Sequence, residues 1–152
     1  METARKKRRG YRVLGIVLLS ILGVLIVGSG VAMLALEPGR REAMNIVVDD
    51  VSFKGLRDGA YTGEYAGTKD HLRDVKVNVT VAGGKLTAVD VTGGALAGEK
   101  QNGEIRGGAS IQALFGKVIE KQSLVVDTIS GATITCKTHL KAVENALEQA
   151  IK

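Results

Sequence analysis

The strongest constraint on this chain is a long uncharged run near its start. Residues 13–36, 24 in number, contain no Asp, Glu, Lys or Arg. As a helix at roughly 1.5 Å per residue, the run would reach about 36 Å, more than the roughly 30 Å hydrocarbon core of a bilayer. A cleaved signal peptide has a shorter apolar region of about 7–15 residues, and no clear cleavage site follows this one. We therefore expect residues 13–36 to be an uncleaved transmembrane anchor.

Charge is sorted to one side of this run. Residues 1–12 contain six of the 21 Lys and Arg residues and one of the 16 Asp and Glu residues. The rest of the chain contains 15 basic and 15 acidic residues, so its net charge is zero. Because Lys and Arg beside a span stay on the cytoplasmic side, we expect a single-pass cell-membrane protein with a cytoplasmic N-terminus and an extracytoplasmic C-terminal domain. The folded part has no charge excess and few aromatic side chains, which argues against a nucleic-acid partner.

Composition divides the chain into four parts. A basic tail at residues 1–12 and the anchor at 13–36 precede a polar stalk at 37–56 and a domain at 57–152. In the stalk, we expect Pro38 and Gly39 to end the anchor helix. The segment that follows, up to Leu56, reads as a helix leading into a short strand. The last part has the size of one compact domain.

Periodicity within the domain predicts a sheet followed by helices. Valines alternate with polar residues in the clearest strand, and Gly83-Gly84 makes a tight turn after it. The expected strands are residues 60–65, 75–81, 86–91 and 124–126. The expected helices are residues 110–121, with Ser110 as N-cap, and 134–152. Residues 93–108 read as glycine-rich and irregular. An antiparallel sheet with two packed helices is an α+β domain.

The last predicted helix has an apolar face and a charged face. The residues expected in the core are Cys136, Leu140, Val143, Leu147, Ala150 and Ile151. The residues expected on the solvent face are Lys137, Lys141, Glu144 and Glu148. The single cysteine allows no internal disulfide. Together with His139 it would supply only two ligands, so we expect no metal site.

A stretch that contains a carboxylate, several hydroxyl groups and a glycine lies just before this helix. Its sequence is Asp127-Thr-Ile-Ser-Gly-Ala-Thr133. Backbone N–H groups are unpaired at a helix start, so this composition has two interpretations. Ser130 or Thr133 caps the helix after a turn at Gly131, or the helix start binds an anion such as phosphate. No nucleophile stands beside a base, so we expect no catalytic residue.

Three motifs resemble one known family. The stretch Asp127 to Thr133 keeps every fixed position of the D-x-x-S/T-G-A-T signature of the FMN-binding domain family. That family includes the G subunit of Rnf complexes, the C subunit of sodium-pumping NADH:quinone reductases and stand-alone membrane-anchored flavoproteins, which this short chain resembles most. Asp58-Gly-Ala-Tyr-Thr-Gly63 is similar to the family's opening D-G-x-Y-x-G. The run from Val77 to Val91 is similar to its V-x-V-T-V-x-x-G-K-I-x-x-V-x-V hairpin.

Two departures limit what the resemblance transfers. Thr135-Cys136 stands where family members often have Thr-Ser or Ser-Ser. The segment from Gly93 to Glu104 lacks the His-Glu pair that family members commonly carry there. No contacts to the flavin ring are therefore carried over to that segment.

The resemblance implies a covalent flavin. Thr133 would carry FMN through a phosphoester bond, installed from FAD by a separate magnesium-dependent flavin transferase that recognises Asp127 and Ser130. The implied cofactor-binding residues are Asp127, Ser130, Gly131, Ala132, Thr133 and Thr135. The protein would be an electron-transfer flavoprotein rather than a stand-alone enzyme, with redox partner proteins or a quinone-linked dehydrogenase as partners. The alternatives are a non-covalent FMN-binding accessory module of a reductase and a cofactor-free anchored interaction domain.

Overall fold

The computed structural model of the protein describes the backbone of residues 2–151 and the side chains of residues 14–151. The chain divides after Glu37 into two compact units. Its first helix, α1, spans Glu2–Met44. The side chains of the basic tail expected at residues 1–12 lie outside the described residues.

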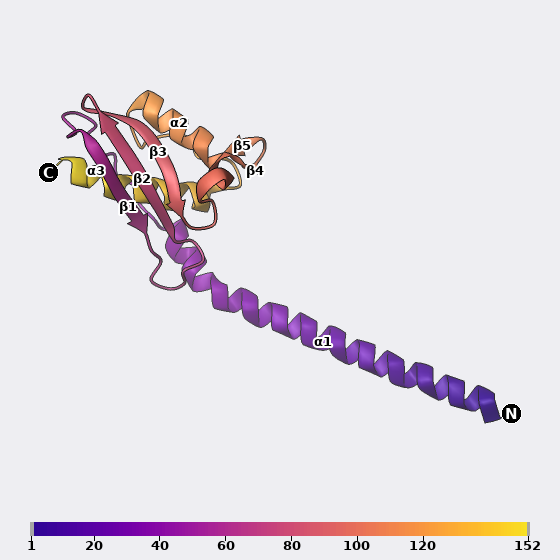
Figure 1. Ribbon diagram of the computed structural model, residues 1–152. Coiled ribbons are helices and arrows are strands. Elements are labelled where there is room, and N and C mark those ends of the chain that lie inside the picture. The colour runs from indigo at the N-terminus through magenta and orange to yellow at the C-terminus, as the bar shows by residue number, and fades with distance from the viewer. Residues whose placement is uncertain (1, 152) are drawn as a thin grey trace. The chain divides into compact units, whose positions relative to one another are not determined.

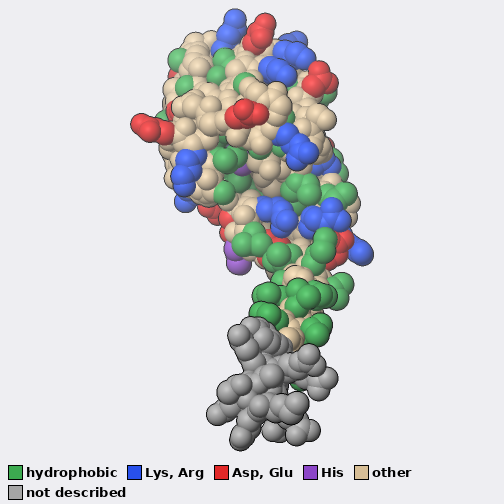
Figure 2. Space-filling model, turned by 90° about the vertical axis from the view of Figure 1, so that its right-hand side faces the viewer, with side chains coloured by type: hydrophobic (Ala, Val, Ile, Leu, Met, Phe, Trp, Pro, Cys, Tyr) green, Lys and Arg blue, Asp and Glu red, His purple; other side chains and the backbone are tan. Residues whose placement is uncertain are grey.

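The apolar part of α1 has the properties of a membrane span. Leu14–Met44 is a helical stretch near the N-terminus that is long and apolar enough to cross a membrane, and its most apolar window is not buried by protein. Its large hydrophobic side chains, such as Leu19 and Val24, are 70% and 73% exposed. Figure 2 shows such side chains around the described part of this helix. A core helix of a soluble protein would bury them, so this surface fits a lipid environment.

The predicted end of the anchor helix is wrong. Pro38 lies inside α1, which continues to Met44. An internal proline removes one backbone hydrogen bond and costs about 3 kcal/mol. The last turn of α1 belongs to the second unit, and its packing within that unit, where Ala43 is 1% exposed, helps to offset this cost.

Glu42 adds polar contacts to the same turn. Its carboxylate accepts hydrogen bonds from the backbone N–H groups of Thr68 and Lys69, each at 2.9 Å. After the helix, residues 46–58 form no strand, so the short strand expected before Leu56 is also wrong.

The sheet is antiparallel, as predicted, with the strand order β1-β2-β3. Its strands are β1 Gly59–Tyr65, β2 Val75–Ala82 and β3 Lys85–Gly93. The four alternating valines of β2 are buried on one face, and no residue between them is buried. The sheet therefore has one core face and one solvent face.

The turn between β2 and β3 is the predicted two-residue hairpin turn. Gly83 and Gly84 have φ values of 62° and 71°, which a type I′ turn requires. The Asp58 carboxylate accepts hydrogen bonds from both of their N–H groups, at 3.0 and 2.8 Å. These bonds, first that of Gly84, lower the pKa of Asp58.

Two helices cover the core face of the sheet. They are α2 Ile111–Lys121 and α3 Thr133–Ile151, which confirms the predicted α+β class. Figure 1 shows α3 running along β1 and β2, while α2 packs on β3. Gly63 in β1 allows this close approach, because a β-carbon there would overlap the backbone of Ala142 and Ala146.

The secondary structure predicted for two segments between these elements is wrong. The region expected to be irregular contains the 3₁₀ helix η1 Gly98–Asn102 and the hairpin of β4 Glu104–Arg106 with β5 Ala109–Ser110. Residues 124–126 form no strand. Leu124 is buried as expected, but its N–H group donates to the Asp50 carboxylate instead of a neighbouring strand.

The faces of α3 were predicted only in part. Cys136 is fully buried, as expected, whereas Ile151 is 45% exposed at the end of the helix. Glu144, expected in solvent, is 2% exposed. It accepts hydrogen bonds from Lys141 at 2.8 Å and from the Asp49 backbone at 3.2 Å. The segment that follows α1 thus covers a face of α3 that the sequence pattern assigned to water.

Candidate functional site at the start of helix α3

The start of α3 lacks a side-chain cap. The helix begins at Thr133, and the carbonyl of Ala132 accepts the first helical hydrogen bond, from Cys136 N–H at 3.0 Å. Ala132 is therefore at the N-cap position, where its methyl group accepts nothing. In the described part of the chain, no group accepts a hydrogen bond from the N–H of residues 133–135. The interpretation that Ser130 or Thr133 caps the helix is wrong.

Buried groups hold the preceding loop in place. Ala132 N–H donates to the Ile129 carbonyl at 2.9 Å, and Ile129 N–H donates to Cys136 Sγ at 3.4 Å. Ile129 and Ala132 are 9% and 7% exposed. By contrast, Asp127, Ser130 and Thr133 are exposed. The apolar members of the motif fix the loop from inside, and its polar members remain accessible.

Arg106 places a positive charge against this loop. Gly131 has φ of 76°, and a β-carbon on it would lie 2.7 Å from both Cδ and Nε of Arg106. Glycine at this position thus allows the Arg106 side chain, from β4, to lie on the loop. Among the residues that the structure describes, no carboxylate forms an ion pair with Arg106. Sequence reasoning missed Arg106, because the β4–β5 hairpin that positions it was not predicted.

The motif opens onto a cavity of about 520 Å³. Its lining residues are Arg40, Met44, Gly131, Ala132, Thr133, Ile134, Thr135 and Lys137. Lys137 is engaged there with the end of α1, since its ammonium donates to the carbonyls of Met44 and Ile46 at 2.7 and 3.0 Å. The structure thus brings four of the six predicted cofactor residues onto one cavity. Asp127 and Ser130 lie on the exposed loop outside its lining.

This arrangement suits a phosphate group. Unpaired N–H groups and the positive end of the helix dipole favour an anion at the start of α3. The Arg106 guanidinium adds a cation that matches phosphate oxygens geometrically. No group of three or more His, Cys, Asp or Glu residues among those described is placed to hold a metal ion.

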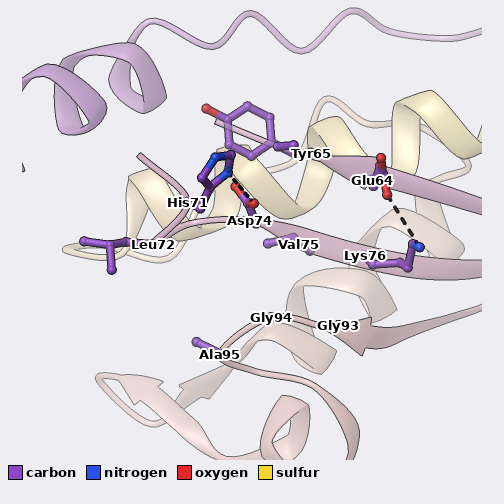
Figure 3. A pocket seen from close by; sticks show the side chains of 11 residues that line it. Glu64, Tyr65, His71, Leu72, Asp74, Val75, Lys76, Gly93, Gly94 and Ala95 are labelled. Atoms are coloured by element: carbon purple, nitrogen blue, oxygen red, sulfur yellow. Dashed lines mark hydrogen bonds and ion pairs between the residues drawn. The ribbon is translucent and has the colours of Figure 1, made fainter. Parts of the chain in front are cut away.

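A further hollow, of about 400 Å³, lies beside the ends of β1 and β2 (Figure 3). Its charged side chains are already paired with one another. His71 Nδ1 lies 2.9 Å from Asp74, and Lys76 Nζ lies 3.5 Å from Glu64. Because these charged groups have partners within the chain, they make this hollow a weaker candidate for a binding site than the start of α3.

Comparison with known families decides the class of the domain. A family model described as FMN-binding domain matches residues 71–148, just over half of the chain. The chain belongs to the FMN-binding domain family. The matched range contains β2, β3, α2, the whole motif from Asp127 to Thr133 and most of α3. No curated protein and no solved structure matches the chain.

Family membership makes this a flavin-binding domain with FMN as its cofactor. FMN carries a terminal phosphate, which is the kind of anion that an uncapped helix start favours. The opening motif at Asp58 to Gly63 lies outside the matched range. In the structure, its residues stabilise the fold. Asp58 fixes the hairpin turn, and Gly63 lets β1 approach α3.

Proposed function

We propose that this protein is a membrane-anchored, extracytoplasmic electron carrier that holds FMN through a phosphoester bond to Thr133. The observation that carries the proposal is the exposed Thr133 at the uncapped start of α3, within a domain of the FMN-binding family. FMN supplies one- and two-electron redox chemistry when bound. The chain itself has to bind, orient and retain the group.

The phosphate is expected to be held by the helix start and by Arg106. A phosphodiester keeps one negative charge, which the N–H groups of residues 133–135 and the helix dipole stabilise. Arg106 lies against Gly131, two residues before the attachment point. Its positive charge next to this loop would help to offset that of the phosphate.

The attachment reaction needs an accessible hydroxyl and a separate enzyme. In the transfer from FAD, the Thr133 oxygen attacks the phosphorus of the FMN half. The new O–P bond forms as the pyrophosphate P–O bond breaks, AMP leaves, and the hydroxyl proton passes to a base on the transferase. Asp127 and Ser130 are exposed and make no hydrogen bond to other described side chains, so they are free to contact that enzyme.

The anchor supports the proposed location. The basic tail at residues 1–12 favours retention of the N-terminus in the cytoplasm, and the domain would then lie outside. In that compartment a dissociable flavin would be lost by dilution, whereas a covalent one is retained. Redox partner proteins or a quinone-linked dehydrogenase would supply or remove the electrons.

The attachment site is tested by co-expression of the full chain with a flavin transferase. The denatured wild-type band should fluoresce as flavin, and Thr133→Ala should not. Thr128→Ala is the matched control, because Thr128 is an exposed threonine in the same loop and should not affect labelling. A fluorescent band from Thr133→Ala would refute the assignment.

The location is tested separately. A reporter enzyme that is active only outside the cytoplasm, fused after Lys152, should be active. Neutralising the six Lys and Arg residues of the tail should lower that activity, since they are expected to set the orientation. Activity of a reporter restricted to the cytoplasm would contradict the proposed orientation.

A further inference from the structure

The loop of residues 66–74, which joins β1 to β2, is bound to the end of α1. The carboxylate of Glu42, in the last turn of α1, accepts hydrogen bonds from two successive backbone N–H groups of the loop, those of Thr68 and Lys69. It also accepts one from the Thr68 hydroxyl, at 3.0 Å. Hydrogen bonds to a charged acceptor are stronger than neutral ones, so they fix this segment on the helix. We call residues 66–74 the β1–β2 loop.

A second contact lies three residues closer to the apolar run. Gly39 of α1 packs so tightly on the β1–β2 loop that a β-carbon there would overlap the Asp70 carboxylate. That carboxylate accepts a hydrogen bond from Leu72 N–H at 3.1 Å. Gly39, Asp70 and Leu72 therefore form a chain of contacts from the helix to the loop. All of them belong to the second compact unit.

Leu72 is the one large apolar residue of this loop, and it is 63% exposed. In Figure 3 its side chain points away from Val75, the first residue of β2. A single exposed leucine would be ordinary on a soluble surface, so its surroundings have to decide its role.

Exposed apolar residues gather around the same place. Among the described residues of the second unit, the exposed large hydrophobic ones are Met44, Val47, Leu72, Val125 and Ile151. Three of these five lie at the end of α1, just after it, or on the loop that is bound to it. An apolar surface at this place faces whatever surrounds the first residues after the anchor.

The sequence indicates what that surrounding is. The uncharged run ends at Leu36, and Gly39 and Glu42 follow it by three and six residues. In a helix these steps are about 5 and 9 Å along the axis. The polar headgroup region of a bilayer is about 5–8 Å deep on each side of the hydrocarbon core. In an anchored chain, the two contacts with the loop would therefore lie at the depth of the lipid headgroups or just outside them.

We propose that the β1–β2 loop rests on the bilayer in which the chain is anchored, with the Leu72 side chain inserted among the lipids below their headgroups. The partner is thus the phospholipid interface, because the loop is bound to the residues that emerge from it. The proposal depends on the anchor, but it requires neither the flavin nor a particular side of the membrane.

The charges of the loop suit this position. Arg73 pairs with Asp70 at 3.2 Å, and His71 lies 2.9 Å from Asp74. Paired charges lose less than unpaired ones on leaving bulk water. Lys69 is exposed, and a lysine can lay its methylene groups along apolar surface while its ammonium stays at the lipid phosphates.

The contact would also affect the candidate site. The cavity at Thr133 is lined by Arg40 and Met44, which come from the same end of α1. A domain held by one helix alone can swing about it, whereas a second attachment through the loop would fix the distance of this cavity from the bilayer. A redox partner within the membrane would then find the start of α3 at a constant depth.

The test uses a single tryptophan, because the chain contains none. Leu72→Trp is introduced into the full chain, which is placed in phosphatidylcholine nanodiscs with bromine on the acyl chains just below the headgroups. The chain is produced without a flavin transferase, since a bound flavin would also quench tryptophan. Brominated lipid should strongly reduce the fluorescence of Leu72→Trp relative to unbrominated nanodiscs.

The matched control is Ala82→Trp. Ala82 is exposed and is the last residue of β2, so it lies about 23 Å along the strand from Val75, where the loop ends. Its tryptophan should emit at longer wavelength than that of Leu72→Trp, and bromine should leave its intensity unchanged. An unquenched Leu72→Trp, or equal quenching at the two positions, would overturn the proposal.

A second pair of variants tests the attachment of the loop to α1. In the Leu72→Trp chain, Glu42→Ala removes the acceptor that holds the loop and should reduce the quenching by bromine. Glu64→Ala removes an exposed glutamate of β1 that pairs with Lys76 at 3.5 Å, and it should leave the quenching unchanged. Equal quenching with and without Glu42 would refute its role in positioning the loop.

The outcomes are independent of those for the flavin. A wild-type chain that takes up flavin, beside an unquenched Leu72→Trp, overturns the membrane contact alone. A quenched Leu72→Trp, beside a wild-type chain that takes up no flavin from an active transferase, supports the membrane contact and overturns the attachment at Thr133.

Discussion

The two helices of the domain begin in different ways. At the start of α2, the Ser110 hydroxyl accepts a hydrogen bond from Ala113 N–H at 3.2 Å. At the start of α3, Ser130 and Thr133 offer the same chemistry, yet neither caps the helix. The difference teaches that the residue types alone do not decide their use. One helix start is capped by the side chain before it, and the other has no side-chain cap.

The loop before the uncapped start of α3 is held by buried contacts. These contacts are made by the buried Ile129 and Ala132 and by the thiol of Cys136, whose pKa burial raises. They come from the core side. The domain can therefore leave polar groups of the motif exposed without losing the shape of the loop, which a functional site requires.

The largest effect on stability is expected from Gly131→Ala. Its φ of 76° is left-handed, which costs a residue with a β-carbon about 1–2 kcal/mol, and the new methyl group would also displace Arg106. Urea unfolding of the full chain in detergent measures the loss. Gly98→Ala is the matched control, with φ of 63° and nothing within 4 Å. Equal losses of unfolding free energy in the two variants would show that the Arg106 contact does not contribute to stability.

The next effect compares the two helix starts directly. Ser110→Ala removes a cap and should lower the unfolding free energy by about 1 kcal/mol, with flavin loading unchanged. Ser130→Ala removes no such bond and should stay within about 0.5 kcal/mol of wild type, with slower loading by the transferase. The reverse pattern would mean that α3 is capped and α2 is not.

A smaller gain in stability is expected when an anion is supplied by mutation. Thr133→Asp puts a carboxylate in the first turn of α3, where the helix dipole should stabilise the domain by about 0.3–1 kcal/mol at low salt. Thr133→Asn is the uncharged control. The gain should shrink as salt is added, since the site is exposed. A salt-independent or absent gain would argue against an open anion site.

The smallest effect concerns pH. Burial lowers the pKa of His139 in the folded chain. Near pH 6.5 its imidazole therefore binds a proton in the unfolded chain but stays largely unprotonated in the folded chain. Stability should therefore fall as pH decreases below 6.5, by less than about 0.8 kcal/mol between pH 7.5 and 6. His139→Leu should lose this part of the pH dependence, measured by urea unfolding against wild type. An identical pH profile in both would place the His139 pKa near its ordinary value.

Local patterns predicted much of this fold. The alternating valines of β2, the Gly83-Gly84 turn and the Ser110 cap each specify their structure through neighbours in sequence, and all three were found. The extension of α1 past Pro38 and the burial of Glu144 depend on contacts with distant segments. Periodicity contains no information about such contacts.

The candidate site also combines residues that the sequence predicts with residues that only distant contacts bring there. The motif from Asp127 to Thr133 was readable because its residues are consecutive, and the family match includes it. Arg106 comes from a hairpin 25 residues before Gly131, and nothing in its own sequence context marks it as a neighbour of the motif.

The central claim is that the open start of α3 carries a phosphoester-linked flavin on Thr133. Its most direct test is the intact mass of the full chain after co-expression with a flavin transferase, followed by fragmentation of the peptide that contains the site. The claim predicts one added mass equal to FMN less one water, located on Thr133 and missing from Thr133→Ala. An unmodified wild-type chain beside a transferase that labels another substrate, or an adduct on any other residue, would contradict it.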